Sequence, residues 1–187
     1  MTIQQLRQPA IQFYHHPITT TFSREALSLE DVFLRVATNR YMDVTAELRS
    51  LATPKERSDF KAKRLDFVCF SGLFSHRRDD GLTRHSSLLC LDFDHLGPRL
   101  PEARALLADD PCLETELLFT SPSGDGLKWV VEIDLQRATH RTWFRAIQEY
   151  ARRTYGLEAD ANCANESRGC LLCHDPMAYV NPLVCPY

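Results

Sequence analysis

Two aspartates separated by a single residue, Asp92 and Asp94, are the residues of this sequence best suited to chemistry. They follow the apolar run 88–91, which is too short for a helix and is bounded by polar sequence, as expected for a buried strand. Side chains at positions i and i+2 of a strand project from the same face. The two carboxylates are therefore predicted to lie side by side, with Phe93 pointing into the opposite layer.

Two neighbouring carboxylates repel each other unless a cation lies between them. A divalent ion such as Mg²⁺ takes hard oxygen ligands and commonly binds through one or two carboxylates plus substrate phosphates. The pattern therefore predicts a metal-dependent phosphoryl-transfer site on the edge of a sheet. On this pattern alone, a strand that simply ends in two solvated acids is an equally good interpretation.

The segment 120–128 is a second candidate, because it combines Ser123, Gly124, Gly126 and Lys128 in one turn. The two glycines permit positive φ and allow the backbone to approach a ligand closely. Successive amide N–H groups in such a turn can form an anion-binding concavity, to which the lysine adds a charge. An ordinary hairpin turn is the alternative.

Asp160 and Arg168 form a third candidate, between an expected long helix and the expected last strand. A two-metal phosphoryl-transfer centre needs about three carboxylates, so Asp160 would complete the set. The planar guanidinium of Arg168 suits a nucleotide phosphate. The alternative is structural, with Asp160 capping a turn and Arg168 pairing with Glu166 or Asp175.

Periodicity and capping signals predict the elements that position these residues. In the N-terminal section we expect a strand at 11–14, a helix after the cap Ser28, a second helix carrying Val44, Leu48 and Leu51, a helix at 54–64, a strand at 66–70 and a polar loop at 75–84. In the C-terminal section we expect a strand ending at 94, a helix at 102–108, strands at 116–120 and 127–134, a helix at 139–155 and a last strand at 170–173.

The order of the later elements is β-α-β-β-α-β, the split arrangement of ferredoxin-like and RNA-recognition-like folds. In that topology the first and third strands lie at the centre of the sheet, so the two aspartates and Lys128 would reach the same open region. We therefore predict an α+β fold in which a mostly helical section, 1–86, packs on a core formed by 87–187 as one compact domain.

Length and composition place the chain among ordinary globular proteins, with 187 residues, 44% hydrophobic and 25% charged. No apolar stretch approaches the roughly 18 residues that span a bilayer, and the N-terminus lacks a signal-peptide pattern, so we expect a cytoplasmic protein without membrane contact. The net charge of −3 provides no global basic field. Contacts with nucleic acid would have to come from local patches such as the basic segment 54–64. The pattern of this segment favours a solvent-exposed helix face over a phosphate-binding one.

Seven cysteines, an odd number, indicate reduced thiols in a cytoplasmic chain rather than a disulfide framework. A zinc knuckle is the minority interpretation, and its candidate ligands are Cys163, Cys170, Cys173, His174 and Cys185. Against it, a strand at 169–173 would send Cys170 and Cys173 to opposite faces.

Three motifs occur in a fixed order along the chain. They are Asp92-Phe93-Asp94, then Ser121-Pro122-Ser123-Gly124-Asp125-Gly126-Leu127-Lys128, then Asp160 followed by Ser167-Arg168 and Asp175-Pro176-x-x-Tyr179-x-Asn181-Pro182. Together they resemble the archaeo-eukaryotic primase superfamily and, more closely, its branch with the VirE N-terminal domain, found in mobile elements. The resemblance covers roughly residues 11–182.

The resemblance implies an RNA-recognition-like catalytic core with a metal pair at the D-x-D motif, a serine- and glycine-rich turn against the nucleotide, and a later metal carboxylate. Carried over by position, it makes Asp92, Asp94 and Asp160 the catalytic ligands of Mg²⁺ or Mn²⁺. It makes nucleotide contacts of Ser123, Gly124, Gly126, Lys128 and Arg168.

The implied function is primase-like nucleotidyl transfer from a nucleoside triphosphate on a single-stranded nucleic-acid template, in mobile-element, phage or plasmid replication. Larger members carry a helicase-like region downstream, so a helicase would come from another chain or a missing region. Lys128 stands where the family usually has a histidine, and the compact charge of a lysine does not reproduce the geometry of an imidazole. Two alternatives stay open: a nucleic-acid-binding module that has lost catalysis, and a metal-dependent nuclease.

Overall fold

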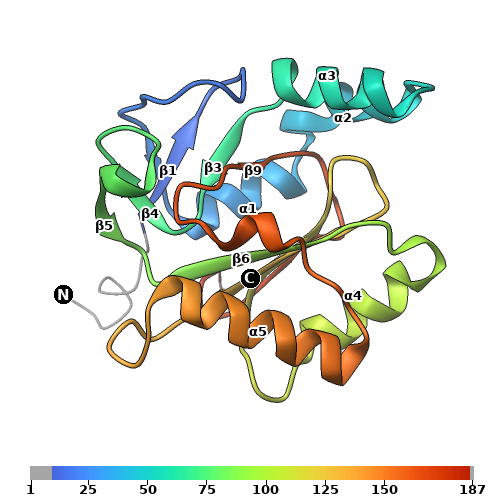
Figure 1. Ribbon diagram of the computed structural model, residues 1–187. Helices are drawn as coiled ribbons and strands as arrows, with labels where there is room; N and C mark the ends of the chain where they lie inside the picture. The colour runs from blue at the N-terminus through green and yellow to red at the C-terminus, as the bar shows by residue number, and fades with distance from the viewer. Residues whose placement is uncertain (1–9, 186–187) are drawn as a thin grey trace.

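The computed structural model describes residues 10–185, which form an α+β fold of five α-helices and three antiparallel sheets (Figure 1). The α+β class is thus confirmed. The helices are α1 (Leu29–Ala37), α2 (Met42–Ser50), α3 (Pro54–Arg64), α4 (Leu100–Ala108) and α5 (His140–Tyr155). None of these described helices is long and apolar enough to cross a membrane.

Strands from both ends of the chain form the first sheet, in the order β2-β1-β3-β9. Their bounds are Ala26–Leu27 for β2, Ile11–Tyr14 for β1, Phe67–Cys69 for β3 and Cys170–Leu171 for β9. A separate hairpin of β4 (Gly72–Phe74) and β5 (Leu82–His85) follows β3.

The second sheet has the order β10-β7-β8-β6, and it carries the D-x-D motif at the end of its edge strand. Its strands are β6 (Leu88–Phe93), β7 (Thr115–Thr120), β8 (Leu127–Glu132) and β10 (Tyr179–Val180). Within β6, Leu91 and Phe93 face the cluster beneath α4 and α5, whereas Asp92 faces the other side. The predicted alternation along this strand is therefore confirmed.

Local capping explains why the helices begin where they do. Ser28 and Thr53 each form a reciprocal capping box, with Asp31 and Glu56 respectively, and Pro54 occupies the first helical position of α3. The side chain of Thr139 accepts a hydrogen bond from the Thr142 backbone at the start of α5. The caps of α1 and α3 at Ser28 and Thr53 are the signals from which those two helix starts were predicted.

The two four-stranded sheets pack around three apolar clusters. One cluster lies between the sheets and under α1, and it joins side chains of β1 and β3 to those of β7 and β8. A second fills the space between the second sheet and helices α4 and α5, which cover that face (Figure 1). A third, smaller cluster joins the outer face of the first sheet to β4. Helices α2 and α3 lie at one end of the molecule, beyond the first sheet.

The prediction for the last strand was wrong in its pairing. We expected residues 170–173 to complete the sheet beside β6, but β9 pairs with β3 in the first sheet instead. As a result β7 and β8 are central and β6 is an edge strand, with β10 at the opposite edge. A two-residue strand has no periodicity from which its partner could be inferred. Its position depends on tertiary contacts, such as the close approach of Gly169 to the Phe67 ring.

The N-terminal section contains more strand than predicted. Besides α1, α2 and α3 it holds the strands β1 to β5, so it is not mostly helical. Part of the expected loop at 75–84 belongs to the hairpin strand Leu82–His85. Half of the described side chains in that strand are exposed, which is why its sequence resembles a polar loop.

Candidate active site

One cavity of about 210 Å³ is lined by all three predicted acids, Asp92, Asp94 and Asp160. It lies where the edge strand β6 of the second sheet faces the edge strand β9 of the first, and α3 and the turn before β8 contribute to its wall. A single water needs only about 10–15 Å³ of such volume, so the cavity has room for a ligand.

Asp92 and Lys128 form a buried ion pair in this cavity. They are directly opposite each other in the antiparallel register of β6 and β8, which places both side chains on the same face of the sheet. The Lys128 ammonium donates a hydrogen bond to Asp92 Oδ2, and both side chains are almost fully enclosed. The prediction that the D-x-D motif and Lys128 reach the same region is confirmed.

Two polar atoms in the cavity lack a hydrogen-bond partner among the described residues. They are Asp92 Oδ1 and Ser121 Oγ, and both are buried. Leaving such a group unpaired costs about 1–3 kcal/mol, and more where the group is charged. Buried polar atoms of this kind are usually satisfied in proteins by a hydrogen bond or contact with a ligand, an ion or a water molecule.

Burial raises the pKa of Asp92, the Lys128 ammonium lowers it, and the nearby Asp94 and Asp160 raise it again. Burial lowers the pKa of Lys128, but negative charge on the Cys170 sulfur and on the Asp92 carboxylate outweighs that effect, so the pKa is raised and the amine is protonated. Asp92 is therefore paired with one buried ammonium while two further acids lie nearby, and Lys61 and Arg168 bring additional positive charge to the same cavity.

Asp160 is held against the D-x-D strand by its backbone. Its amide N–H donates to the carbonyl of Asp92 at 2.8 Å, while its side chain accepts from Asn162. Arg168 Nη2 lies 3.5 Å from Asp160 Oδ2. Burial raises the pKa of Asp160, but the hydrogen bonds from Asn162 and the charge of Arg168 outweigh it and lower the pKa. Asp160 therefore caps the turn, as the structural alternative predicted, and it also lines the cavity.

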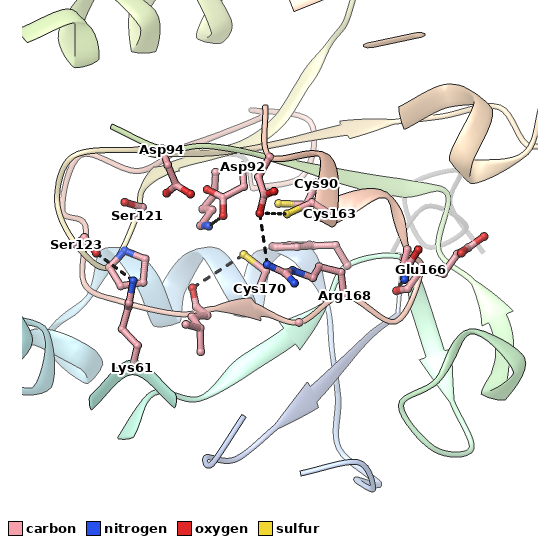
Figure 2. A pocket seen from close by; sticks show the side chains of 18 of the residues that line it. Lys61, Cys90, Asp92, Asp94, Ser121, Ser123, Cys163, Glu166, Arg168 and Cys170 are labelled. Atoms are coloured by element: carbon pink, nitrogen blue, oxygen red, sulfur yellow. Dashed lines mark hydrogen bonds and ion pairs between the residues drawn. The ribbon is translucent and has the colours of Figure 1, made fainter. Parts of the chain in front are cut away.

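Lys61 of α3 joins the N-terminal section to the serine- and glycine-rich turn. Its Nζ donates to Ser123 Oγ at 3.3 Å, and both residues line the cavity (Figure 2). Arg49 of α2 donates from Nε to the Pro122 carbonyl at 3.2 Å and from Nη2 to the Ser121 carbonyl at 3.4 Å. The turn is therefore fixed from outside by two cations.

The predicted glycines do not line the cavity. A Cβ on Gly126 would lie 2.4 Å from the carbonyl oxygen of Phe93, so glycine is required there for the turn to close on β6. Gly124 has φ of +85° and packs beside Arg49. In this structure both glycines shape the turn that presents Ser123 and Lys128.

The donor chemistry of the cavity fits Mg²⁺ or Mn²⁺, because the open positions are carboxylate and hydroxyl oxygens. Among residues 10–185, however, no three histidine, cysteine, aspartate or glutamate side chains are already gathered into a metal-binding group. Binding a cation would therefore require the acids to draw closer around the open Asp92 oxygen.

The zinc interpretation receives no support from the described residues. Cys173 Sγ donates to the Thr120 carbonyl, and His174 Nδ1 lies 2.9 Å from the Thr38 carbonyl. Cys185 lies beside Glu30 instead. Three thiols, those of Cys90, Cys163 and Cys170, do line the cavity of the acids.

Several cavity residues were not predicted to lie with the acids, although Cys163 and Cys170 were named as candidate zinc ligands. They are Lys61, Ser121, Cys90, Cys163, Cys170, His140, Asn165 and Glu166. Lys61 and Ser123 are 62 residues apart, so no local pattern joins them. The basic composition of residues 54–64 was the available signal for a contact of this helix with the site, and it was interpreted as a solvent-exposed helix face instead.

The comparison with protein families gives one match. The family model described as "BT4734-like, N-terminal domain" matches residues 60–180, more than half of the chain, and the chain belongs to this family. The matched range includes the D-x-D strand, the turn and the segment carrying Asp160 and Arg168. Comparisons with curated proteins and with solved structures found no match.

Proposed function

We propose that the cavity binds a nucleoside triphosphate with a divalent cation, and that the chain is a primase-like nucleotidyltransferase domain acting on a single-stranded template. One observation carries the proposal. The three predicted acids and three cations, Lys61, Lys128 and Arg168, line a single cavity in which a buried carboxylate oxygen and a buried hydroxyl have no partner among residues 10–185.

The resemblance to the archaeo-eukaryotic primase superfamily and its VirE N-terminal branch supports this proposal. Each of the first two motifs, and the segment with Asp160 and Arg168, contributes side chains to the cavity wall, and the match to the BT4734-like family includes these segments. The adjacent strands β6, β8 and β7, with α4 and α5 on one face, also follow the order of a split ferredoxin-like core up to its fourth strand.

Each charged side chain has a separate task in this proposal. Asp92, Asp94 and Asp160 would hold Mg²⁺ or Mn²⁺, which supplies activation of a primer 3′-hydroxyl and neutralisation of triphosphate charge. Lys61 and Arg168 would bind phosphate oxygens. Without a ligand, Lys128 neutralises Asp92. When the nucleotide binds, the Lys128 ammonium can also donate to a phosphate oxygen, because it has three N–H donors.

The template would contact α3. No residue of this helix is buried, and it carries five cationic and two acidic side chains. Lys55 and Lys63 are exposed, whereas Lys61 reaches into the cavity. A single strand of nucleic acid carries the complementary charge, and lying along α3 would lead it to the cavity.

The test is incorporation of labelled nucleotide on single-stranded templates with Mg²⁺ or Mn²⁺. We expect incorporation by the unaltered chain and its loss in the double variant Asp92→Asn, Asp94→Asn. The matched control is Asp43→Asn, Asp109→Asn, which removes two exposed acids that belong neither to α3 nor to the cavity lining. Incorporation that survives in the first variant would overturn the catalytic assignment, and cleavage of the template would indicate a nuclease.

A second candidate is a binding module that keeps the cavity without catalysis. Two observations favour it: the Lys128 ammonium already occupies Asp92 Oδ2, and within residues 10–185 no three ligands are gathered for a metal. In this case the chain would bind template in a salt-sensitive way, and the Asp92→Asn, Asp94→Asn variant would bind at least as tightly, because two negative charges are removed. Binding without incorporation across several templates would decide for this candidate.

A further inference from the structure

His140 forms part of the cavity wall at a distance from the charged turn. It is the first residue of α5 and is 5% exposed. The next residue, Arg141, lies 4.0 Å from Glu166 and donates to Asn165 Oδ1 at 2.9 Å. In Figure 2, Glu166 lies at one end of the cavity, and Lys61 and Ser123 lie at the other. His140 therefore belongs to the end away from the turn.

A chain of hydrogen bonds fixes which nitrogen of His140 carries the proton. The backbone N–H of Ser87 donates to His85 Nδ1 at 2.9 Å, so this nitrogen must be an unprotonated acceptor. In neutral His85 the proton is then on Nε2, which lies 3.0 Å from His140 Nδ1 and donates to it. His140 Nδ1 is consequently unprotonated, and the proton of neutral His140 is on Nε2.

The surroundings keep both rings neutral. Protonating His140 Nδ1 would place two donors against each other at 3.0 Å. Burial lowers the pKa of His140 to about 4, and His85 and Arg141 contribute in the same direction, whereas Asp79 opposes them. Arg141 is itself bound by Asp79 at 2.8 Å and faces Glu166. No described residue makes a hydrogen bond to His140 Nε2.

We propose that this end of the cavity is a subsite for the uncharged sugar or base of a nucleotide, in which His140 Nε2–H donates to a ligand oxygen. The inference rests on the proposed function and names the part of the ligand that this end holds. The cations that line the cavity, Lys61, Lys128 and Arg168, contact the acids and the turn, whereas Arg141 is paired with Asp79. A neutral donor with a fixed tautomer suits a hydroxyl or carbonyl oxygen rather than a phosphate.

The binding test compares two probes that share phosphates but differ in the nucleoside. One probe is each of the four ribonucleoside triphosphates in turn with Mg²⁺, and the other is inorganic triphosphate with Mg²⁺, both measured by calorimetry. Loss of one neutral hydrogen bond in His140→Phe should weaken the preferred nucleotide by about five- to tenfold. Binding of inorganic triphosphate should stay unchanged, and the exposed control His76→Phe should bind both probes normally.

Equal effects of His140→Phe on both probes, or no effect on either, would overturn the subsite while leaving the proposed function standing. If neither probe binds the unaltered chain, the proposed function and the subsite both fail. The two failures are therefore distinguishable.

A spectroscopic test of the tautomer does not require a ligand. Long-range proton–nitrogen NMR should show His140 protonated on Nε2 at pH 7, with its signal among the seven histidines identified by its loss in His140→Gln. His85→Gln should preserve this pattern, because an amide can accept from Ser87 and donate to His140. His85→Phe should mix the tautomers and move the pKa of His140 toward about 6.5. An Nδ1–H tautomer in the unaltered chain would overturn the inference.

Discussion

Among single residues, Lys128 decides how the cavity behaves without a ligand. It is enclosed beside Asp92, and the carboxylate has one satisfied and one open oxygen. Removing one member of a buried ion pair leaves the other charge without compensation, which is usually more costly than removing both. Because Asp92 and Lys128 are direct cross-strand partners in β6 and β8, their interaction can be measured with single and double variants.

Lys128→Met should lower the free energy of unfolding by about 3 kcal/mol, because Asp92 would be buried without its partner. Adding Asp92→Asn should recover most of that loss, since no buried charge would remain. Urea denaturation of the two single variants and the double variant measures the coupling. Additive losses would show that the ion pair contributes nothing in solution.

Mn²⁺ should raise the melting temperature by about 5–10 °C when it is present at about a hundred times its Kd, because it binds the folded chain only. Asp92→Asn should abolish the increase, since the open carboxylate oxygen is the expected first ligand. Differential scanning fluorimetry with and without a chelator measures the effect. Asp43→Asn, at an exposed position of α2, is the control, and an equal increase in both variants would contradict a metal site at Asp92.

Among the secondary-structure elements, those with strong local signals were predicted well. Residues 54–64 were expected as a helix and form α3 with those bounds, because Thr53, Pro54 and Glu56 specify its start. The alternation along β6 likewise placed Asp92 and Phe93 on opposite faces.

Elements and contacts that depend on tertiary packing were not predicted. The pairing of β9 with β3 connects Leu171 with Phe67, and no local rule relates these positions. The contacts of Lys61 with Ser123 and of His85 with His140 likewise join segments that are far apart in sequence. Asp92 and Asp94 could be predicted from a strand pattern, whereas the cavity around them depends on tertiary contacts.

The exposed cations of α3 give a test of template binding at the scale of one helix. Lys55→Ala with Lys63→Ala should weaken binding to a single-stranded oligonucleotide and reduce the slope of log K against log salt by roughly 1.4, about 0.7 for each lost phosphate contact. Fluorescence anisotropy over a range of salt concentrations measures both. The matched variant Arg145→Ala, Arg153→Ala on α5 should leave the slope unchanged, and equal losses in both would remove α3 from the interface.

In the whole molecule, the cluster between the sheets joins the two sections of the chain. Phe13 of β1 belongs to the same cluster as Phe119 of β7 and Val130 of β8. A fully shared cluster predicts that both sheets unfold together, with no section melting independently.

Phe13→Ala should therefore destabilise the entire chain, by about 3–5 kcal/mol. Trp129 and Trp143 both lie in the second half, so their fluorescence reports on that half alone. We expect the fluorescence transition in urea to shift together with the far-UV circular dichroism transition. A fluorescence midpoint that stays in place would show that the second sheet is stable without the first.

The pairing of β9 with β3 also determines when the cavity can form during synthesis. Translation proceeds at about 5–20 residues per second, so β3 leaves the ribosome several seconds before β9. During that interval one edge of β3, with the buried residues Phe67 and Val68, has no partner strand, and such an edge invites pairing with other chains. A nascent chain halted before Gly169 should therefore bind chaperones that recognise extended apolar segments, and release from them should coincide with closure of the wall beside Asp92.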